Sequence, residues 1–276
     1  MIEEKFFDKI KERKSLMKQD KKKKNFYIEE ETRINKYLAQ AGICSRRDAD
    51  KLILEGKVMV NGRVAEPGTK VSGRDKISVS GKAVGGRQET AVLAYYKPVG
   101  VICSERDKHA EKLLSKQFSY PVRVTYAGRL DKDSEGLLLL TNDGILIDSL
   151  MRGKNKHEKE YVVKVKTDIT EEFLQNMSQG VYLTELEKKT RPCKIEQMGK
   201  YTFRIILTQG LNRQIRRMCK ELGYEVHSLK RVRVANIELG RLKPGEYREI
   251  AGKELAKLYE IAGLSTPENN ENDETV

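Results

Sequence analysis

Near the middle of this chain, a charged loop bounded by glycines runs directly into four consecutive leucines. The loop is the sequence GRLDKDSEG at residues 128–136, and the leucines occupy residues 137–140, just before the sequence TNDG. An apolar run of this length between turn residues indicates a buried strand. The side chains of the loop then lie at the mouth of a folded core, where carboxylates are held stiffly and partly out of water. The pattern makes Asp131 and Asp133 candidates for chemistry, without ranking them.

The neighbours of these two carboxylates predict different tasks for them. Arg129 and Lys132 flank Asp131 and favour its ionised form. Asp133 and Ser134 are better suited to capping the turn or the backbone of the loop. An aspartate in a glycine-bounded loop is most often a turn residue, and this alternative stays open for Asp131. The leucines favour a functional loop, because they anchor it rigidly on the core.

The charge balance indicates a polyanionic partner. The 276 residues carry a formal net charge of +13, and the basic residues are clustered rather than evenly spread. Clustered positive charge favours nucleic acid first and an anionic membrane second, with a merely solubilising surface as the alternative. No stretch approaches the roughly 18 apolar residues of a membrane span, and the N-terminus lacks the apolar region of a secretory signal. We expect no membrane association.

The cysteines and histidines are scattered. No two of the four cysteines form a CxxC pair, and the three histidines are equally isolated. This spacing argues against a zinc site and against a disulfide framework. The sequence therefore predicts no metal site and a reducing, cytoplasmic environment.

Composition changes along the chain and suggests five segments. The first is rich in lysine, and it is either an RNA-contacting arm or a solvated tail. Three glycines between residues 81 and 86 indicate a linker. The expected segments are a flexible basic extension at 1–32, a small module at 33–80, a linker at 81–90, a larger domain at 91–262 and an acidic disordered tail at 263–276.

The small module has the pattern of two helices followed by a hairpin. Ser45-Arg46-Arg47-Asp48 is a capping box for the second helix, and Asn61-Gly62 is typical of a type I′ turn. This helix-helix-hairpin order resembles the S4 RNA-binding domain, which implies that the helix pair presents a basic face to structured RNA. An interaction module with solubilising charges is the alternative. The residues expected on the basic face are Lys36, Arg46, Arg47 and Lys51.

The larger domain mixes strands and helices without strict alternation. Irregular strand spacing favours an α+β fold with a mixed, largely antiparallel sheet over a doubly wound fold. Strands are expected at 92–96, 137–141, 161–166 and 201–208. Helices are expected at 145–151, 171–178, 212–222 and 253–262.

The helix expected at 212–222 is strongly amphipathic. Asn212 suits its N-cap, and an apolar face repeats at helical spacing from Ile215. The opposite face carries Arg213, Arg216 and Arg217. Arg216 lies at the boundary of the two faces, where its planar guanidinium can grip one carboxylate while the other cations serve phosphates. An ordinary amphipathic surface helix is an equal alternative.

Tyr161 follows the charged sequence HEKE and opens a strand. Its ring can stack on a base, and its hydroxyl can handle a proton. A tyrosine at the start of a strand is more often a packing residue, so the position carries weight only in combination with the other two segments.

Together these segments resemble the RsuA-type family of ribosomal RNA pseudouridine synthases, in which an S4 domain precedes the catalytic domain. The specific match is the sequence GRLDKDSEGLLLLTNDG at residues 128–144. Supporting matches are YKPVG at 96–100, KEY at 159–161 and NRQIRRM at 212–218. The segments HEKEY and GLNR are most similar to the branch that acts on large-subunit (23S) rRNA.

The resemblance implies a role for each matched residue. It makes Asp131 the catalytic aspartate, Tyr161 the active-site tyrosine and Arg216 the basic partner of the aspartate. It makes Arg129 a residue that holds the RNA once the base is flipped out. RNA contacts are also expected from Asn212, Arg213 and Arg217.

The implied reaction turns a uridine of rRNA into pseudouridine. The N1–C1′ bond is cleaved, the uracil rotates, and C5 bonds to C1′, so no metal, nucleotide or flavin cofactor is required. Asp131 either attacks C1′ or removes the C2′ proton, and both routes stay open. The target base must leave its stack at a cost of a few kcal/mol. We expect a monomer whose partner is rRNA, with tRNA as an open second substrate.

Two other classes of function remain as alternatives. One is a non-catalytic, S4-containing ribosome assembly factor, which would have little reason to keep Asp131, Tyr161 and Arg216 together. The other is an N-glycosidase, which would need an acid or a water-activating pair that the sequence does not offer.

Overall fold

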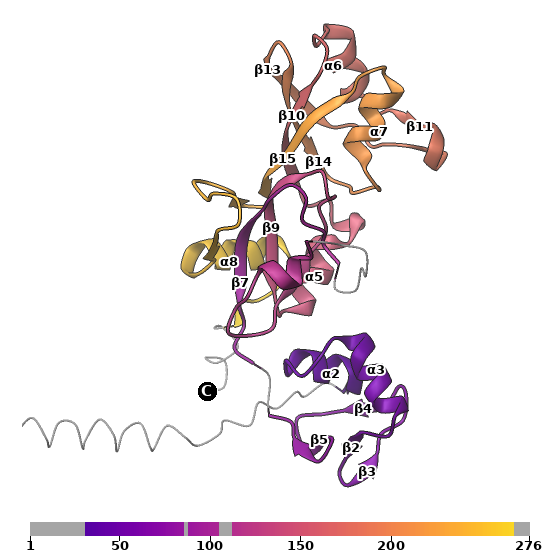
Figure 1. The fold of residues 1–276 in the computed structure, drawn as a ribbon, viewed down its shortest axis with the longest axis vertical. Coiled ribbons are helices and arrows are strands. Elements are labelled where there is room, and N and C mark those ends of the chain that lie inside the picture. Colours follow the sequence, from indigo (N-terminus) through magenta and orange to yellow (C-terminus); the bar gives the residue numbers. More distant parts are fainter. Residues whose placement is uncertain (1–30, 86–87, 105–111, 268–276) are drawn as a thin grey trace, which may run out of the picture. The chain divides into compact units, whose positions relative to one another are not determined.

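A computed structural model describes residues 31–85, 88–104 and 112–267 (Figure 1). The expected basic extension lies outside these residues except for its last two positions, and the expected acidic tail lies outside them beyond residue 267. The chain forms two compact units, one ending at Gln88 and the other beginning at Glu89.

The first unit is a helix pair with two small sheets. Its helices are α2 (Ile34–Gln40) and α3 (Arg46–Leu54). A four-stranded sheet has the order β3-β2-β5-β6, and a second sheet pairs β1 with β4. The strands are β1 (Thr32–Arg33), β2 (Val58–Val60), β3 (Arg63–Val64), β4 (Lys70–Val71), β5 (Ile77–Val79) and β6 (Lys82–Ala83).

Local sequence explains the turns of this unit. Ser45 accepts a hydrogen bond from the backbone N–H of Asp48 at 3.2 Å and donates to its carboxylate at 2.6 Å, so Ser45 is the N-cap of α3, as the expected capping box requires. Asn61 and Gly62 both have positive φ and join β2 to β3, as a type I′ turn requires. The two helices and the sheet bury one small apolar core around Leu38, Ala49 and Val58.

The second unit is built on one nine-stranded sheet. Seven strands lie in the order β13-β14-β10-β15-β9-β7-β17, with β16 beside β15 and β8 beside β9. Every pairing is antiparallel except β15 with β9. The strands are β7 (Val92–Lys97), β8 (Thr125–Ala127), β9 (Glu135–Thr141), β10 (Lys159–Val165), β13 (Lys194–Gly199), β14 (Thr202–Leu207), β15 (Val226–Val234), β16 (Ile237–Glu238) and β17 (Tyr247–Glu249).

Helices cover both ends of this sheet. In Figure 1, α5 and α8 lie near β7 and β9, and α6 and α7 lie near β10 and β14. The helices are α4 (Leu114–Gln117), α5 (Gly144–Met151), α6 (Glu171–Ser178), α7 (Gln214–Glu221) and α8 (Gly252–Ile261). The remaining short elements are η1 (Gly153–Asn155), η2 (Thr184–Leu186) and the paired strands β11 (Tyr182–Leu183) and β12 (Lys188–Lys189).

The four leucines of β9 join two separate cores. Leu137 and Leu139 pack in the cluster that includes residues of α5 and α8. Leu138 and Leu140 point to the other face and pack with Leu93 and other residues of the second cluster. Since side chains alternate along a strand, this arrangement fixes β9 from both sides.

The sequence TNDG after the leucines has a structural role, because it connects β9 to α5. Asp143 caps α5 by accepting hydrogen bonds from the backbone of Ile145 at 2.8 Å and Leu146 at 3.2 Å. Its other carboxylate oxygen accepts from the hydroxyl of Tyr259 on α8 at 2.6 Å. This half of the motif therefore ties β9, α5 and α8 together.

The predicted α+β class with a largely antiparallel sheet is confirmed. The expected strands and helices appear with small shifts of their ends, but several strands of the sheet were not expected, and the longest of these is β15. Its sequence, VHSLKRVRV, lacks a clean alternation because Lys230 and Arg231 are adjacent to each other. The described helices are all too short, or too polar, to cross a membrane.

Candidate active site

The loop between β8 and β9 is held mainly through its backbone. The N–H of Ser134 donates to the carbonyl of Asp131 at 3.1 Å and closes a turn. The N–H of Gly100 donates to the carbonyl of Lys132 at 2.8 Å. These bonds fix the path of the chain and leave the carboxylates of Asp131 and Asp133 available to other groups.

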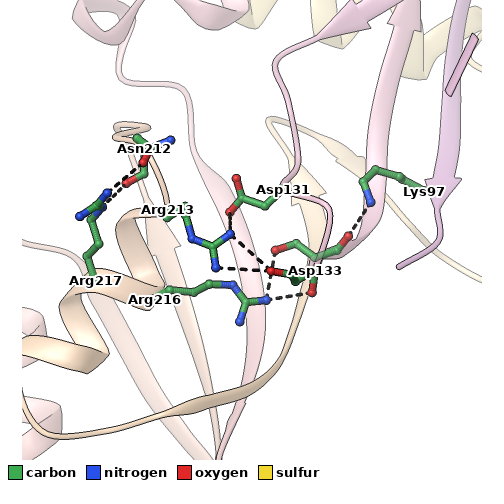
Figure 2. Close-up of polar contacts among 8 residues, drawn as sticks. Lys97, Asp131, Asp133, Asn212, Arg213, Arg216 and Arg217 are labelled. Atoms are coloured by element: carbon green, nitrogen blue, oxygen red, sulfur yellow. Dashed lines mark hydrogen bonds and ion pairs between the residues drawn. The ribbon is translucent and has the colours of Figure 1, made fainter. Parts of the chain in front are cut away.

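Lys97 also supports the loop, although no role was predicted for it from the sequence. Its side chain is 0 % exposed, and Nζ donates to the carbonyls of Ser134 at 2.7 Å and Pro98 at 2.8 Å. Burial lowers the pKa of Lys97, while nearby acidic groups partly offset that shift. Its place in the matched sequence YKPVG was the available signal. Lys97 holds the loop from the side opposite to α7 (Figure 2).

Arg213 lies between the two carboxylates of the loop (Figure 2). Its guanidinium is 3.9 Å from Oδ2 of Asp131 and 3.4 Å from Oδ2 of Asp133. The side chain of Asp131 is 35 % exposed, so this carboxylate is accessible and yet partly desolvated. The contact with Asp131 is an ion pair at the limit of direct contact, which a substrate group can displace at low cost.

Arg216 reaches the loop at a different point from the one that we expected. Its Nη2 donates to the backbone carbonyl of Asp133 at 2.8 Å and lies 3.5 Å from the hydroxyl of Ser134. Burial lowers the pKa of Arg216, with a further lowering by Arg213, while the charges of Asp133 and Asp131 partly offset that shift. In the described chain, the guanidinium that pairs with Asp131 belongs to Arg213, because Arg213 precedes α7 in a left-handed conformation and Arg216 follows one turn later.

The expectation that Asn212 caps this helix is wrong. The N-cap is Arg213, with φ 49°, and Gln214 closes the turn by accepting from the N–H of Leu211 at 3.0 Å. Asn212 instead accepts hydrogen bonds from the guanidinium of Arg217, at 3.0 Å to its carbonyl and 3.2 Å to its side chain. Arg217 also forms an ion pair with Glu185. Two residues expected at RNA are thus bonded to each other here.

Tyr161 is linked to the loop by the register of the sheet. It is the partner of Arg231 on β15, and Arg231 is the partner of Gly136 on β9. Gly136 follows the loop directly and is in turn the partner of Lys97 on β7. Tyr161 therefore lies on the same row of four neighbouring strands that carries the loop. Its half-buried ring packs against the cluster that includes the apolar face of α7.

Gly136 lies at a close approach between β9 and β15. It has φ +105°, and a Cβ atom there would overlap the carbonyl oxygen of Arg231. Only glycine fits both requirements without strain. The second glycine of the loop motif thus lets the two halves of the sheet join beside Asp131.

The remaining candidates are exposed. Arg129 is exposed in the loop, one residue before the buried Leu130. In the first unit, Arg46, Arg47 and Lys51 lie on the exposed side of α3, while Lys36 on α2 is partly exposed. No group of three or more acidic, cysteine or histidine side chains able to hold a metal occurs within residues 31–85, 88–104 and 112–267.

This geometry suits a reaction in which a single carboxylate is the reacting group. Asp131 is accessible, rigidly mounted and surrounded by cations, and an aromatic ring lies two strands away from its loop. Such a carboxylate can act as a nucleophile or as a base towards a neutral substrate, while the cations bind a polyanion.

Comparison with known families matches both units. Residues 32–77 match the S4 domain, and residues 91–221 match the family described as RNA pseudouridylate synthase. Both matches agree with the resemblances found in the sequence.

Individual relatives cover most of the chain. The "Dual-specificity RNA pseudouridine synthase RluF" of Escherichia coli (strain K12) is 42% identical over 86% of this chain and 81% of its own length. The "Ribosomal large subunit pseudouridine synthase B" of Bacillus subtilis (strain 168) is 42% identical over 83% of this chain and 96% of its own. A solved structure, "Crystal structure of pseudouridylate synthase", aligns with TM-score 0.61 and 29% identity over 82% of this chain and 99% of that one.

Proposed function

The chain belongs to the RsuA-type family of RNA pseudouridine synthases, which are isomerases, and we propose that it modifies a uridine of ribosomal RNA in the large subunit. The observation that carries this proposal is the 42% identity, over 96% of the relative's length, to a large-subunit pseudouridine synthase. The first relative's "dual-specificity" keeps a second RNA, such as tRNA, open as a further substrate.

In this proposal Asp131 is the catalytic residue. It attacks C1′ of the flipped uridine or removes the C2′ proton, and either route needs an ionised carboxylate that a substrate can reach. The ion pair with Arg213 at 3.9 Å supports the ionised form, and the 35 % exposure supports access. Asp133 orients Arg213, and Arg216 holds the loop backbone.

Tyr161 stacks on the uracil and assists the loss of the C5 proton. Its position on the row of strands that carries the loop supports this role. Arg129 contacts the RNA beside the flipped nucleotide. Asn212, Arg213 and Arg217 bind phosphates at the start of α7, once RNA displaces the bonds that they make in the free protein.

The S4 unit binds structured RNA through Lys36, Arg46, Arg47 and Lys51. Their exposure on the helix pair supports this role. We assign the RNA-binding module to 33–80, the linker to 81–90 and the catalytic domain to 91–262. The enzyme acts as a cytoplasmic monomer without a cofactor.

Release of tritium from RNA labelled at C5 of uridine tests this function. The wild type should release tritium from large-subunit rRNA transcripts, and Asp131→Ala should lower the rate by at least about 10³-fold, because it removes the reacting group. Arg241→Gln, at an exposed arginine outside the loop sequence 128–136, is the control and should match the wild type. No release by the wild type from any large-subunit transcript would contradict the substrate assignment, and an active Asp131→Ala would contradict the site.

A further inference from the structure

Arg231 is a buried cation with an unused hydrogen-bond donor beside the active-site loop. Its side chain is 2 % exposed, and Nε donates to the carbonyl of Leu137 at 2.7 Å. Its Nη2 atom is buried and has no hydrogen-bond partner in the described part of the chain. A desolvated guanidinium with an unused donor costs free energy. This position therefore fits a negative partner that the free protein does not supply.

Lys159 is a second unpaired cation at the same place. It lies two residues before Tyr161 on β10, so both side chains leave the same side of that strand. It forms no ion pair or hydrogen bond with the described residues and is half-buried. Burial, and then repulsion by Arg231, lowers the pKa of Lys159 to about 8. The lysine thus lies close to the arginine without an anion between them.

The acidic residues next in sequence are engaged elsewhere. Glu160 pairs with Arg233 at 2.8 Å and with Arg204 at 3.3 Å. Glu158 pairs with Arg233 at 2.9 Å. Because neighbouring side chains alternate along β10, the carboxylate of Glu160 lies on the opposite side from Lys159 and Tyr161. The two cations remain uncompensated although acids surround them in the sequence.

The reaction itself generates a suitable anion. When N1–C1′ breaks, both electrons stay on the uracil and spread from N1 to the carbonyl oxygens. The sugar either bonds to Asp131 through C1′ or loses the proton on C2′ to Asp131. A phosphodiester is a poor alternative ligand, because Arg231 is 2 % exposed, whereas a base stacked on its strand partner Tyr161 would lie beside it.

We propose that Lys159 donates hydrogen bonds to a carbonyl oxygen of the departing uracil, with the unused Nη2 of Arg231 adding positive charge beside it. This inference rests on the proposed function. Lys159 transfers no proton: it stabilises the uracil anion until C5 bonds to C1′, after which the C5 proton leaves and N1 is protonated. If Asp131 has taken the C2′ proton, it returns this proton to C2′ when C5 bonds to C1′.

Single-turnover kinetics with C5-tritiated large-subunit rRNA transcripts test the proposal. Lys159→Met keeps the length of the side chain and removes its charge, and it should lower the rate at saturating enzyme by about 100-fold. The Kd for RNA should change less than about threefold, since the anion forms only after binding. Lys159→Arg should recover the rate to within about tenfold of wild type. Lys164→Met, an exposed lysine on the other side of β10, should behave as wild type.

Thermal unfolding separates this role from a structural one. Removing an uncompensated charge should make Lys159→Met melt at a higher temperature than wild type. A rate within threefold of wild type, a loss confined to Kd, or a lower melting temperature without rescue by Lys159→Arg would overturn the proposal. If the wild type releases tritium and Asp131→Ala does not, any of these results removes the role of Lys159 and leaves the proposed function standing.

Discussion

Two arginines on one turn contact the same loop in different ways. Arg213 neutralises the carboxylates of Asp131 and Asp133, whereas Arg216 bonds to the backbone carbonyl of Asp133. Both contacts are exposed, but the first is long, at 3.4 to 3.9 Å, and the second is short, at 2.8 Å. Arg213 is therefore the side chain that an RNA phosphate can recruit, and Arg216 is part of the scaffold.

Replacing Arg213 by Gln should separate activity from stability. Ion pairs of this exposure contribute at most about 1 kcal/mol, so the free energy of unfolding should change by less than that. The rate at saturating RNA should fall by about tenfold, because Asp131 loses its charged neighbour. Denaturant unfolding and single-turnover tritium release measure the two effects. A large loss of stability with an unchanged rate would assign Arg213 to the scaffold instead.

Lys159 makes a prediction about pH. The pKa of Lys159 is about 8 in the folded chain, against about 10.4 in the unfolded chain. Between these values the unfolded state binds more protons, so the stability of the wild type rises with pH through this window. Below pH 8 the charged ammonium of Lys159 destabilises the folded state by its full amount, on the order of 3 kcal/mol as an upper bound.

Comparison with Lys159→Met isolates this contribution. The variant should be more stable than wild type at pH 7, and the difference should shrink as the pH approaches 10. Urea unfolding of both proteins at several pH values provides the measurement. A difference that stays constant with pH would mean that the ammonium of Lys159 is not the source.

Among the elements, β9 and β15 matter most, because their short parallel contact joins the two halves of the sheet. The pairing involves Glu135 and Gly136 on β9 with Lys230 and Arg231 on β15. The loop that bears Asp131 enters the sheet at this contact. The site therefore depends on the correct joining of two otherwise antiparallel halves.

Gly136→Ala should disrupt this contact. A Cβ atom would overlap the backbone of Arg231, and φ +105° is unfavourable for alanine. We expect a loss of at least about 2 kcal/mol in stability together with a strong loss of activity. Gly144→Ala, at a glycine with open space at the start of α5, should change stability by less than about 0.5 kcal/mol. Chemical denaturation compares the two, and equal stabilities would refute the close-approach argument.

Local chemistry made some elements predictable and others not. The leucines of β9, the N-cap at Ser45 and the apolar face of α7 were readable, because each depends on neighbouring residues alone. The identity of the N-cap was not, since Asn212 is drawn away by Arg217. Strand β15 was also missed, because the burial of Arg231 depends on its partners across the sheet.

The same limit applies to the active site. The motif nominated Asp131, Tyr161 and Arg216, but it did not reveal which arginine pairs with Asp131 or that Lys97 supports the loop. Both facts depend on the direction in which a side chain leaves the backbone. The positive φ of Arg213 is an example that no spacing rule contains.

At the scale of the whole molecule, the proposed function assigns binding and chemistry to different units. The first has its own small core and exposes cations on α3, and the second carries Asp131 and Tyr161. Binding through the first unit should then be electrostatic and largely independent of the chemical step.

Salt titration of RNA binding tests this division. Replacing Arg46 and Arg47 by Gln should reduce the slope of log K against log salt by about 1 to 2, since each phosphate contact contributes about 0.7–0.9. The rate at saturating RNA should stay within about twofold. The double variant Arg63→Gln with Lys82→Gln, at exposed residues of the small sheet, is the control. Equal slopes for both double variants would argue that the helix pair is not the RNA-binding face.

The burial of β9 on both faces has a consequence for how the enzyme accommodates its substrate. An inner strand whose leucines belong to two cores should have amides among the slowest to exchange with deuterium, because exposing them requires global unfolding. The carboxylate of Asp131 is then attached to the least deformable segment of the fold. In the proposed reaction the protein thus offers a stationary target, and the large displacement that brings the sugar to the carboxylate is made by the RNA.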